Sequence, residues 1–427
     1  MSRTNEKKKK RKKRKQLTSG KIEDLSQANI KDVHLLFAIA LQAWEDENYD
    51  LAEKIHGRIL QLDPQNAAVW LNRGITLGVL ERYEEAVACY NEALKINPDN
   101  ADVWYCKGVA LQDLGRHKEA VTCYDNVLKT SDDIEAWHKK GVALGNLGEH
   151  TEAVHCFDET LKRDPEYADA WYNKGMALKL CGRNKKALPC FVEALRLDPH
   201  DVKAWYNRGA ILRDLEKYEE AATCFDEIIK IDPSEPRGWY YKGVTLQDLG
   251  KHEEALTCYD EVLQIDPDDA DTWSDRGTAF LCLGKHTEAL ICFDKALQID
   301  PHHVYAWYNK GVALKSLERY KKALSCFNKV LQIEPDDVRA LHGKGVVLQE
   351  LGRHKEAVKC FDSALKIDSC NVTAWINKGI SLEALENYTE ALTCFDEALK
   401  LNPHNDQVQS FKRLAIREKH EKDSRTQ

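Results

Sequence analysis

Residues 304–337 of the chain read VYAWYNKGVALKSLERYKKALSCFNKVLQIEPDD, and nearly the same segment recurs on both sides of it. Tryptophan marks the recurrence, because it returns every 34 residues except for one step of 33 and one double step across Leu341. The tryptophans in this series are Trp70, Trp104, Trp137, Trp171, Trp205, Trp239, Trp273, Trp307 and Trp375. Self-similarity at this period is typical of an array of stacked units rather than of one globular core.

We number each copy from its first residue as position 1, and eleven copies then begin at residues 33, 67, 101, 134, 168, 202, 236, 270, 304, 338 and 372. Apolar residues at positions 4, 8 and 11, and again at 20, 21, 24, 27, 28 and 30, have helical spacing. Each copy is therefore predicted to be two amphipathic helices. Glycine near positions 14–18 predicts the turn within a copy, and proline at position 32 predicts the turn between copies.

Tryptophan at position 4, glycine at 8, alanine at 20, an aromatic residue at 24 and proline at 32 together resemble the tetratricopeptide repeat over residues 33–405. The resemblance implies an all-α fold, a right-handed α-solenoid superhelix of about eleven two-helix repeats. We expect the glycine at position 8 to face the alanine at position 20, so that the two helices approach closely. The first copy has Leu36 for tryptophan and Ala40 for glycine, as expected of an end unit.

Three segments are predicted along the chain. Residues 1–32 form a disordered basic arm and connector, residues 33–405 form the repeats, and residues 406–427 form a capping helix and tail. The cap is expected because Val408, Phe411, Leu414 and Ala415 have helical spacing. Two irregular copies are candidate kinks: the third is one residue short and has no proline in its turn, and the tenth has Ser369 in place of the proline.

The composition fits a soluble chain, because no apolar run approaches the roughly 20 residues of a membrane span. No secretion signal is recognisable at the N-terminus, so we expect a cytoplasmic location, or a nuclear one if the organism is eukaryotic. Ten of the 14 cysteines recur at position 23 of successive copies. Neighbouring helices lie about 8–10 Å apart, too far for disulfides, so these thiols are predicted to be free packing residues.

The N-terminal arm is strongly basic, because residues 1–20 carry a net charge of +9 while the whole chain carries −8. Such a run is either a polyanion contact, such as a tether to nucleic acid, or only a solubilising tail. The candidate polyanion-binding residues are Lys7, Lys8, Lys9, Lys10, Arg11, Lys12, Lys13, Arg14 and Lys15.

No enzyme motif is present: the sequence has no phosphate-binding glycine loop, no His-Glu-x-x-His and no nucleophile elbow. Histidines recur at position 17, but other copies have tyrosine there, which indicates a packing position rather than metal ligands. We therefore predict no catalytic residue, no metal site and no cofactor.

Position 7 is always basic in copies two to eleven, and position 25 is usually aspartate. If the two helices of a copy are antiparallel, position 7 lies level with position 25 of the same copy. This predicts a ladder of partly exposed ion pairs, each contributing about 0–1 kcal/mol. The alternative is a pattern of independently solvated charges.

The first helix of each copy carries a surface that resembles the family's ligand-facing wall, at positions 2, 5, 6, 9, 12 and 13. Tyrosine is frequent at position 5 and asparagine at position 6, residues suited to flat contact and to hydrogen bonds with a peptide backbone. Alternatively, these residues only maintain the helix surface. The candidate peptide-binding residues are Tyr172, Asn173, Tyr206, Asn207, Arg213, Arg237, Tyr240, Tyr308 and Asn309.

The resemblance implies a non-enzymatic scaffold or adaptor that binds a protein or peptide partner in the concave groove of the repeats. The alternative is a factor associated with nucleic acid or ribosomes through the basic arm. An enzyme is the third class, but the repeats occupy residues 33–405 and leave no room for a catalytic domain.

Overall fold

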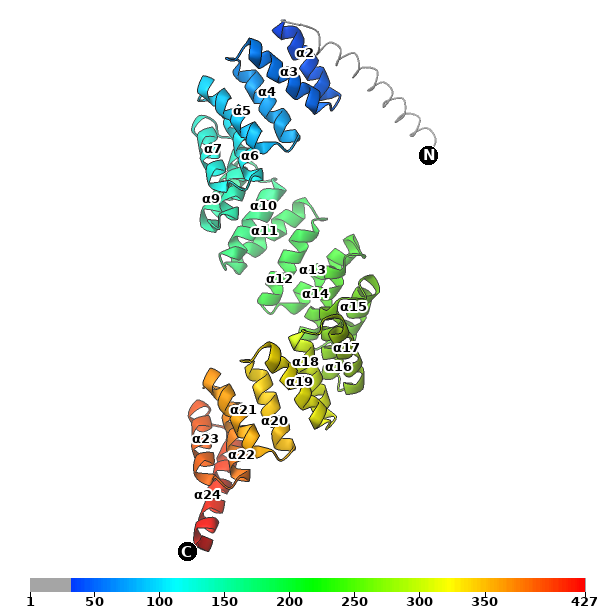
Figure 1. Ribbon diagram of the computed structural model, residues 1–427, viewed down its shortest axis with the longest axis vertical. Helices are drawn as coiled ribbons and strands as arrows, with labels where there is room; N and C mark the ends of the chain where they lie inside the picture. Colours follow the sequence, from blue (N-terminus) through cyan, green and yellow to red (C-terminus); the bar gives the residue numbers. More distant parts are fainter. Residues whose placement is uncertain (1–31, 427) are drawn as a thin grey trace, which may run out of the picture. The chain divides into compact units, whose positions relative to one another are not determined.

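The structure is a computed structural model that describes residues 32–426, in which 23 helices and no strand occur (Figure 1). The basic arm and its candidate residues Lys7 to Lys15 lie outside this range. The helices are α2(Val33–Glu45), α3(Tyr49–Leu62), α4(Ala67–Val79), α5(Tyr83–Ile96), α6(Ala101–Asp113), α7(His117–Thr130), α8(Ile134–Asn146), α9(His150–Arg163), α10(Ala168–Leu180), α11(Asn184–Leu197), α12(Val202–Asp214), α13(Tyr218–Ile231), α14(Pro236–Asp248), α15(His252–Ile265), α16(Ala270–Cys282), α17(His286–Ile299), α18(Val304–Ser316), α19(Tyr320–Ile333), α20(Val338–Glu350), α21(His354–Ile367), α22(Val372–Ala384), α23(Tyr388–Leu401) and α24(Asp406–Thr426).

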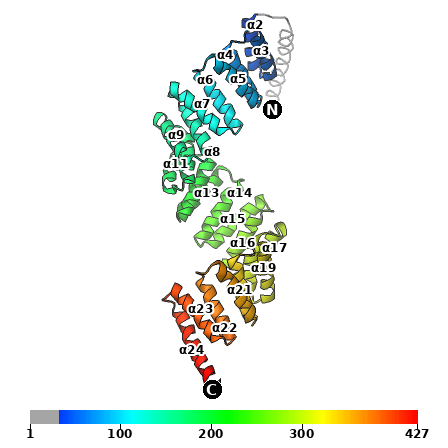
Figure 2. The ribbon, with the colours of Figure 1, turned by 60° about the vertical axis from the view of Figure 1, so that its left-hand side comes forward.

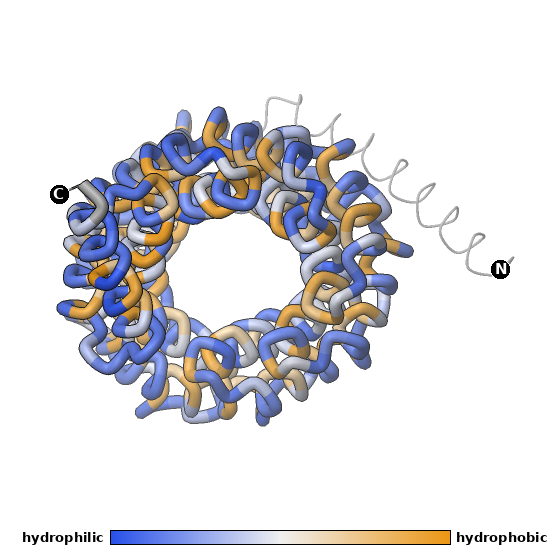
Figure 3. The backbone as a smooth tube through the Cα atoms, turned by 90° about the horizontal axis from the view of Figure 1, so that it is seen from below, coloured by the Kyte–Doolittle hydropathy of each residue, from blue (hydrophilic) through white to orange (hydrophobic). Residues whose placement is uncertain are grey.

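The helices form eleven consecutive pairs, one pair for each predicted copy, followed by α24. The chain divides into two compact units, residues 1–211 and 212–427. Within each unit, every pair packs against its sequence neighbours in the order of the chain (Figure 2). Hydrophobic and hydrophilic stretches alternate along the backbone in Figure 3, as expected of amphipathic helices with one buried face. The predicted all-α solenoid of eleven repeats is confirmed.

Position 15 turns the chain between the two helices of every copy and always has positive φ. Six copies have glycine there, such as Gly115 with φ 71°, but five have glutamate, such as Glu81 with φ 59°. Glycine adopts this backbone conformation without steric strain, whereas glutamate does so at a cost. The prediction of glycine turns is therefore confirmed for six copies and incomplete for the others.

Glycine at position 8 is explained by the aromatic ring at position 24 of the same copy. A Cβ atom on Gly108 would lie 2.7 Å from Tyr124, and one on Gly141 would lie 2.7 Å from Phe157. We expected alanine at position 20 to be the reason for the glycine, and this is wrong. The atoms nearest to a Cβ on the glycine belong to the aromatic ring at position 24. These rings are fully buried and form the centre of each copy.

The tryptophan at position 4 holds the turn between copies. The Trp239 indole N–H donates a hydrogen bond to the Pro233 carbonyl oxygen at 3.0 Å, and Trp307 bonds to Pro301 in the same way at 2.9 Å. The turn after the tenth copy has Ser369 instead of proline and keeps this contact, because Trp375 donates to the Ser369 carbonyl at 3.0 Å. Tryptophan is thus partly a turn residue, since its indole satisfies a carbonyl that the helices leave free.

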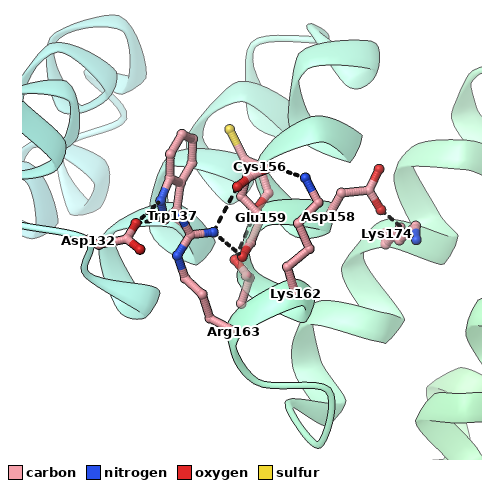
Figure 4. A network of polar contacts seen from close by, with 9 residues as sticks. Asp132, Trp137, Cys156, Asp158, Glu159, Lys162, Arg163 and Lys174 are labelled. Carbon is pink, nitrogen blue, oxygen red and sulfur yellow. Dashed lines mark hydrogen bonds and ion pairs between the residues drawn. The ribbon is translucent and has the colours of Figure 1, made fainter.

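The shortened turn after the third copy is held differently (Figure 4). Trp137 has an aspartate side chain as its acceptor, with the indole nitrogen 3.4 Å from Asp132 Oδ1. Arg163 bonds to the same carboxylate at 2.5 Å and to Glu159 at 2.8 Å. Its guanidinium also lies 5.6 Å from the Trp137 ring centre. An arginine network therefore replaces the proline turn, while the kink predicted there stays a prediction.

A ladder of ion pairs is present, but each pair crosses a repeat boundary. Lys140 of the fourth copy lies 2.6 Å from Asp125 of the third, and Lys174 lies 2.6 Å from Asp158. The same contact recurs in Lys242–Asp226, Arg276–Asp260, Lys310–Asp294 and Lys378–Asp362. The predicted pairing within one copy is wrong in register. Successive residues of a helix point about 100° apart, so position 8 faces its own second helix while position 7 faces that of the preceding copy.

The last helix, α24, repeats the contacts of a first helix without a second helix after it. Val408 and Ala415 are buried, as predicted, whereas Leu414 is 38% exposed. Lys412 lies 2.5 Å from Asp396 and so extends the ladder. Gln409 donates to the Pro403 carbonyl at 3.3 Å, where other copies use tryptophan. Arg413 takes the glycine position, and an arginine side chain there excludes the close approach that a following second helix requires.

Candidate functional site

We call the surface formed by positions 2, 5, 6, 9, 12 and 13 of the first helices the first-helix wall. Its most regular feature is an apolar strip at position 9, which is mostly half-buried. In the first unit the strip consists of Leu41, Ile75, Val109, Val142, Met176 and Ala210. In the second unit it consists of Val244, Thr278, Val312, Val346 and Ile380, with one polar member. An apolar strip of this kind gives contact area to a ligand without selecting its sequence.

The asparagines of the first unit form hydrogen bonds between neighbouring copies. The Asn173 amide nitrogen lies 3.1 Å from His138 Nε2 of the preceding copy. Asn207 is buried, and its amide donates to the Lys203 carbonyl at 2.9 Å and to the Tyr172 hydroxyl at 3.4 Å. The amide oxygen of Asn207 accepts from Lys179 at 3.0 Å. These amides join one repeat to the next, which the sequence did not indicate.

The second unit repeats this pattern. Asn309 donates to the Thr278 hydroxyl at 3.0 Å, and Tyr240 donates to Asp275 at 2.9 Å. Asp275 occupies position 6, where other copies have asparagine, and burial raises the pKa of its carboxyl. The pKa of Tyr240 is also raised, first by burial and then by the Asp275 charge. The carboxyl therefore favours its protonated form more than an ordinary aspartate does.

The basic side chains predicted for the wall have acidic partners. Arg213 lies 2.8 Å from Asp248, and Arg237 lies 2.8 Å from Glu235. The Arg213 side chain is 25% exposed, whereas the Arg237 side chain is 69% exposed. Charge that is already paired attracts an acidic ligand less than free charge does, so these two arginines do not by themselves favour such a ligand.

The nine candidate peptide-binding residues fall into two groups. Tyr172, Asn173, Tyr206 and Asn207 lie in the unit of residues 1–211. Arg213, Arg237, Tyr240, Tyr308 and Asn309 lie in the unit of residues 212–427. All nine belong to first helices, but only Arg237 is exposed and the others are half-buried or buried. Their role in binding a peptide stays a prediction.

A more open pair of wall residues was missed by the sequence analysis. Tyr305 at position 2 is 59% exposed, and the Arg339 guanidinium lies 5.0 Å from its ring centre and 5.2 Å from that of Tyr308. Asp337 holds Arg339 in place at 2.8 Å. An arginine between two tyrosines is a typical contact surface for a protein ligand. An aromatic residue at position 2 was the available sequence signal.

The cysteines at position 23 are free thiols, and all but Cys360 are fully buried. Burial raises the pKa of Cys123 and of Cys156 to about 11, so both thiols stay protonated at neutral pH. Within residues 32–426, no group of three or more histidine, cysteine, aspartate or glutamate side chains could hold a metal ion. In the same range no helix is both long and apolar enough to cross a membrane.

Family models of the tetratricopeptide repeat match most of the chain from residue 80 to residue 405. One model described as a tetratricopeptide repeat matches residues 168–201, 202–235, 236–269, 270–303, 304–337 and 372–405. Two further models with that description match residues 138–178, and residues 101–133 and 338–369. A model described as a TPR repeat matches residues 80–115. No curated protein sequence is similar enough to this chain to count as a relative.

Solved structures similar to the chain include those of yeast Tom70, the Cut9–Hcn1 assembly and YrrB. Yeast Tom70 is 17% identical, with 92% of this chain and 96% of that chain covered and a TM-score of 0.45. The Cut9–Hcn1 assembly of the APC/C matches at 13% identity, with coverages of 94% and 99% and a TM-score of 0.49. YrrB, described as a TPR protein with an unusual peptide-binding site, is 28% identical, with coverages of 44% and 97% and a TM-score of 0.38.

Proposed function

The chain belongs to the tetratricopeptide repeat family, and from this premise we propose that it is a protein–protein interaction scaffold without catalytic activity. It binds an extended peptide or a partner helix along the first-helix wall. The observation that carries this proposal is the apolar strip at position 9, which continues along each unit beside half-buried tyrosines. Apolar area with aromatic side chains beside it is the composition of protein-binding surfaces.

In the second unit, Tyr305, Tyr308 and Arg339 are proposed as the strongest contact. Tyrosine and arginine dominate the binding energy of many protein interfaces. The Arg339 guanidinium is already oriented by Asp337 and by both rings, so binding would cost little further side-chain entropy. The asparagines serve mainly to join repeats, and they support the wall rather than form its exposed surface.

Quantitative affinity capture with mass spectrometry tests this proposal. Proteins retained by the native chain are compared with those retained by a Tyr305→Ala, Arg339→Ala variant. A matched control replaces Ile291, which is 62% exposed on the second helix α17, by serine. We expect specific partners to be lost from the wall variant and kept by the control. Equal retention of partners by all three proteins would show that the binding surface does not include Tyr305 and Arg339.

The association with nucleic acid or ribosomes through Lys7 to Lys15 stays a prediction, because these residues lie outside the described range. It is tested separately by removing residues 1–20 and measuring binding to RNA across a salt series. A polyanion contact predicts an affinity that falls steeply with salt and disappears with the arm.

A further inference from the structure

The first copy contains a pocket on its wall side. It has a volume of about 250 Å³ and lies among α2, α3 and α4. Its lining includes Phe37, Leu41 and Trp44 from α2, His56 from α3, and Asn72 and Ile75 from α4. Four of these six side chains are apolar or largely so, and Phe37 and Leu41 are 37% and 55% exposed at its opening.

Two substitutions at the centre of the copy explain why there is space. Copies two to eleven pack an aromatic residue at position 24 against glycine at position 8, as Tyr90 does against Gly74. The first copy has His56 and Ala40 at these positions. An imidazole fills less volume than a phenyl or phenol ring, so the first copy is less completely packed on its wall side.

The pocket also contains two polar groups without partners. His56 is only 5% exposed, and its Nδ1 atom is buried with no hydrogen-bond partner. Buried polar atoms are usually hydrogen-bonded, so the His56 ring nitrogen is available to bond to a ligand atom or a water in the pocket. Burial lowers the pKa of His56 to about 4, which leaves the imidazole neutral at pH 7.

Asn72 is the second unpaired group. Asn173, Asn207 and Asn377 bond to position 5 of the preceding copy, and Asn309 bonds to position 9. For Asn72 those two positions are Phe37 and Leu41, whose side chains have no polar atom. The amide of Asn72 has no hydrogen-bond partner in the part of the chain that the structure describes. Its whole amide is therefore available to the backbone of a ligand.

The size of the pocket fits one side chain. Small-molecule sites usually have volumes of about 300–1,000 Å³, whereas a cavity of about 150 Å³ already holds benzene. One leucine or phenylalanine side chain therefore fits, with its backbone near Asn72.

The charge around the pocket selects the flanking residues of the ligand. Two acids, Glu45 and Asp46, directly follow Trp44, and Asp46 Oδ2 is buried without a partner. Further along the wall of the same unit, Asp102, Asp113, Glu135 and Asp169 are exposed. Complementary charge favours a ligand rich in lysine or arginine.

We propose that this pocket binds a single leucine or phenylalanine side chain from a basic segment of a partner protein. The proposal rests on the proposed scaffold function and names the chemistry of one ligand of the first-helix wall. In this proposal, Asn72 forms hydrogen bonds with the ligand backbone. The neutral His56 forms a hydrogen bond with a polar atom of the ligand or with a bound water.

The test measures fluorescence anisotropy of a labelled peptide, Ser-Lys-Lys-Phe-Ser-Lys-Lys-Ser, with the full-length protein. Two comparison peptides carry alanine for phenylalanine, or glutamate for every lysine. The decisive variant is Ala40→Gly combined with His56→Phe, which restores the glycine–phenylalanine pair of other copies and fills the pocket. Leu41→Ser tests the opening, and Leu414→Ser is its control, because both leucines are exposed at position 9 of their helices.

We expect saturable binding of the phenylalanine peptide to the native protein. Each comparison peptide should bind the native protein about tenfold or more weakly. The pocket-filling variant and Leu41→Ser should bind the phenylalanine peptide about tenfold or more weakly as well. Leu414→Ser should bind like the native protein, and circular dichroism should show that every variant is folded. If the phenylalanine peptide does not bind at about 1 mM, the proposal is overturned. This holds whether the pocket is empty or occupied by the chain's own residues 1–31. Equal binding to the filled pocket also overturns it, but leaves the contact of Tyr305 and Arg339 untouched.

Discussion

Lys140 Nζ lies 2.6 Å from Asp125 Oδ1, although the lysine belongs to the fourth copy and the aspartate to the third. The same lysine nitrogen lies 5.4 Å from the centre of the Trp137 ring in its own helix. One basic side chain thus contacts the tryptophan that holds a turn and the aspartate of the neighbouring repeat. The charged ladder therefore adds to the interfaces between repeats rather than to the repeats themselves.

The ladder has a gap between the fifth and sixth copies, where Val192 occupies position 25 opposite Arg208. Val192 is 43% exposed, so replacing it by a polar residue removes little buried apolar surface. We expect Val192→Asp to raise the free energy of unfolding by up to about 1 kcal/mol. Asp158→Ala should lower it by a similar amount. Urea unfolding measures both, and the gain should shrink at 1 M salt because screening weakens exposed pairs; a gain that persists there would have another cause.

The helix α8 contains two glycines that should respond oppositely to alanine. A Cβ on Gly141 would lie 2.7 Å from Phe157, whereas one on Gly145 would meet nothing within 4 Å. We expect Gly141→Ala to destabilise the protein by about 1–3 kcal/mol through overpacking. Gly145→Ala should stabilise it by about 0.5–1 kcal/mol, since alanine suits a helix interior better than glycine. Thermal unfolding of the two variants checks both signs, and equal shifts would contradict the packing role of Gly141.

The arginine network at the short turn predicts a local effect. Replacing Arg163 by methionine removes the bonds to Asp132 and Glu159 but keeps an unbranched apolar stem at this position. Amide hydrogen exchange should become faster in residues 131–137 and stay unchanged at a proline turn such as residues 265–269. Uniformly faster exchange would instead indicate a global loss of stability.

The same network predicts a dependence on pH. Hydrogen bonds from Arg163 and then from Lys162 lower the pKa of Glu159 to about 2. An unfolded glutamate has a pKa of about 4.3. The ionised Glu159 therefore contributes fully to the stability of the folded turn above that pH, and this stabilisation is lost as the pH falls toward 2. The protection factors of amides in residues 131–137, which correct for the pH dependence of intrinsic exchange, should therefore fall on acidification more in the native protein than in Arg163→Met. Parallel acid profiles for the two proteins would show that Glu159 contributes nothing to the turn.

The thiols predict a labelling pattern. Cys282 and Cys370 are exposed, whereas the cysteines at position 23 are buried and several have a pKa raised to about 11. Because the thiolate is the reactive form, a raised pKa slows alkylation in addition to burial. At pH 8 we expect Cys282 and Cys370 to react first with iodoacetamide, as read by peptide mass spectrometry. Early labelling of Cys258 would show that the repeats open locally.

The sequence alone was sufficient to predict the repeat period, the two helices of each copy and the atypical first copy. Each of these features depends on residues that are close together in the chain. Apolar spacing of three and four residues defines a helix face, and proline ends a helix whatever surrounds it. The final helix could be predicted for the same reason, from Val408 and Ala415.

The sequence did not indicate which copy supplies the partner of a side chain. Lys140 could not be assigned to Asp125 rather than to a residue of its own copy, because identical repeats contain identical candidates. The candidate site depended on the same ambiguity. Asn207 was suited to a peptide backbone by type, yet its amide bonds to Lys203 and Tyr172.

Local periodicity thus determined that this protein is a stack of helical pairs with an amphipathic first helix in each. Only the tertiary structure decided which polar groups join repeats and which remain open, because that depends on the direction of each side chain across a boundary. Asn72 and Asn207 occupy the same position of their copies. They differ because Phe37 and Leu41 precede one of them, while Tyr172 and Lys179 precede the other.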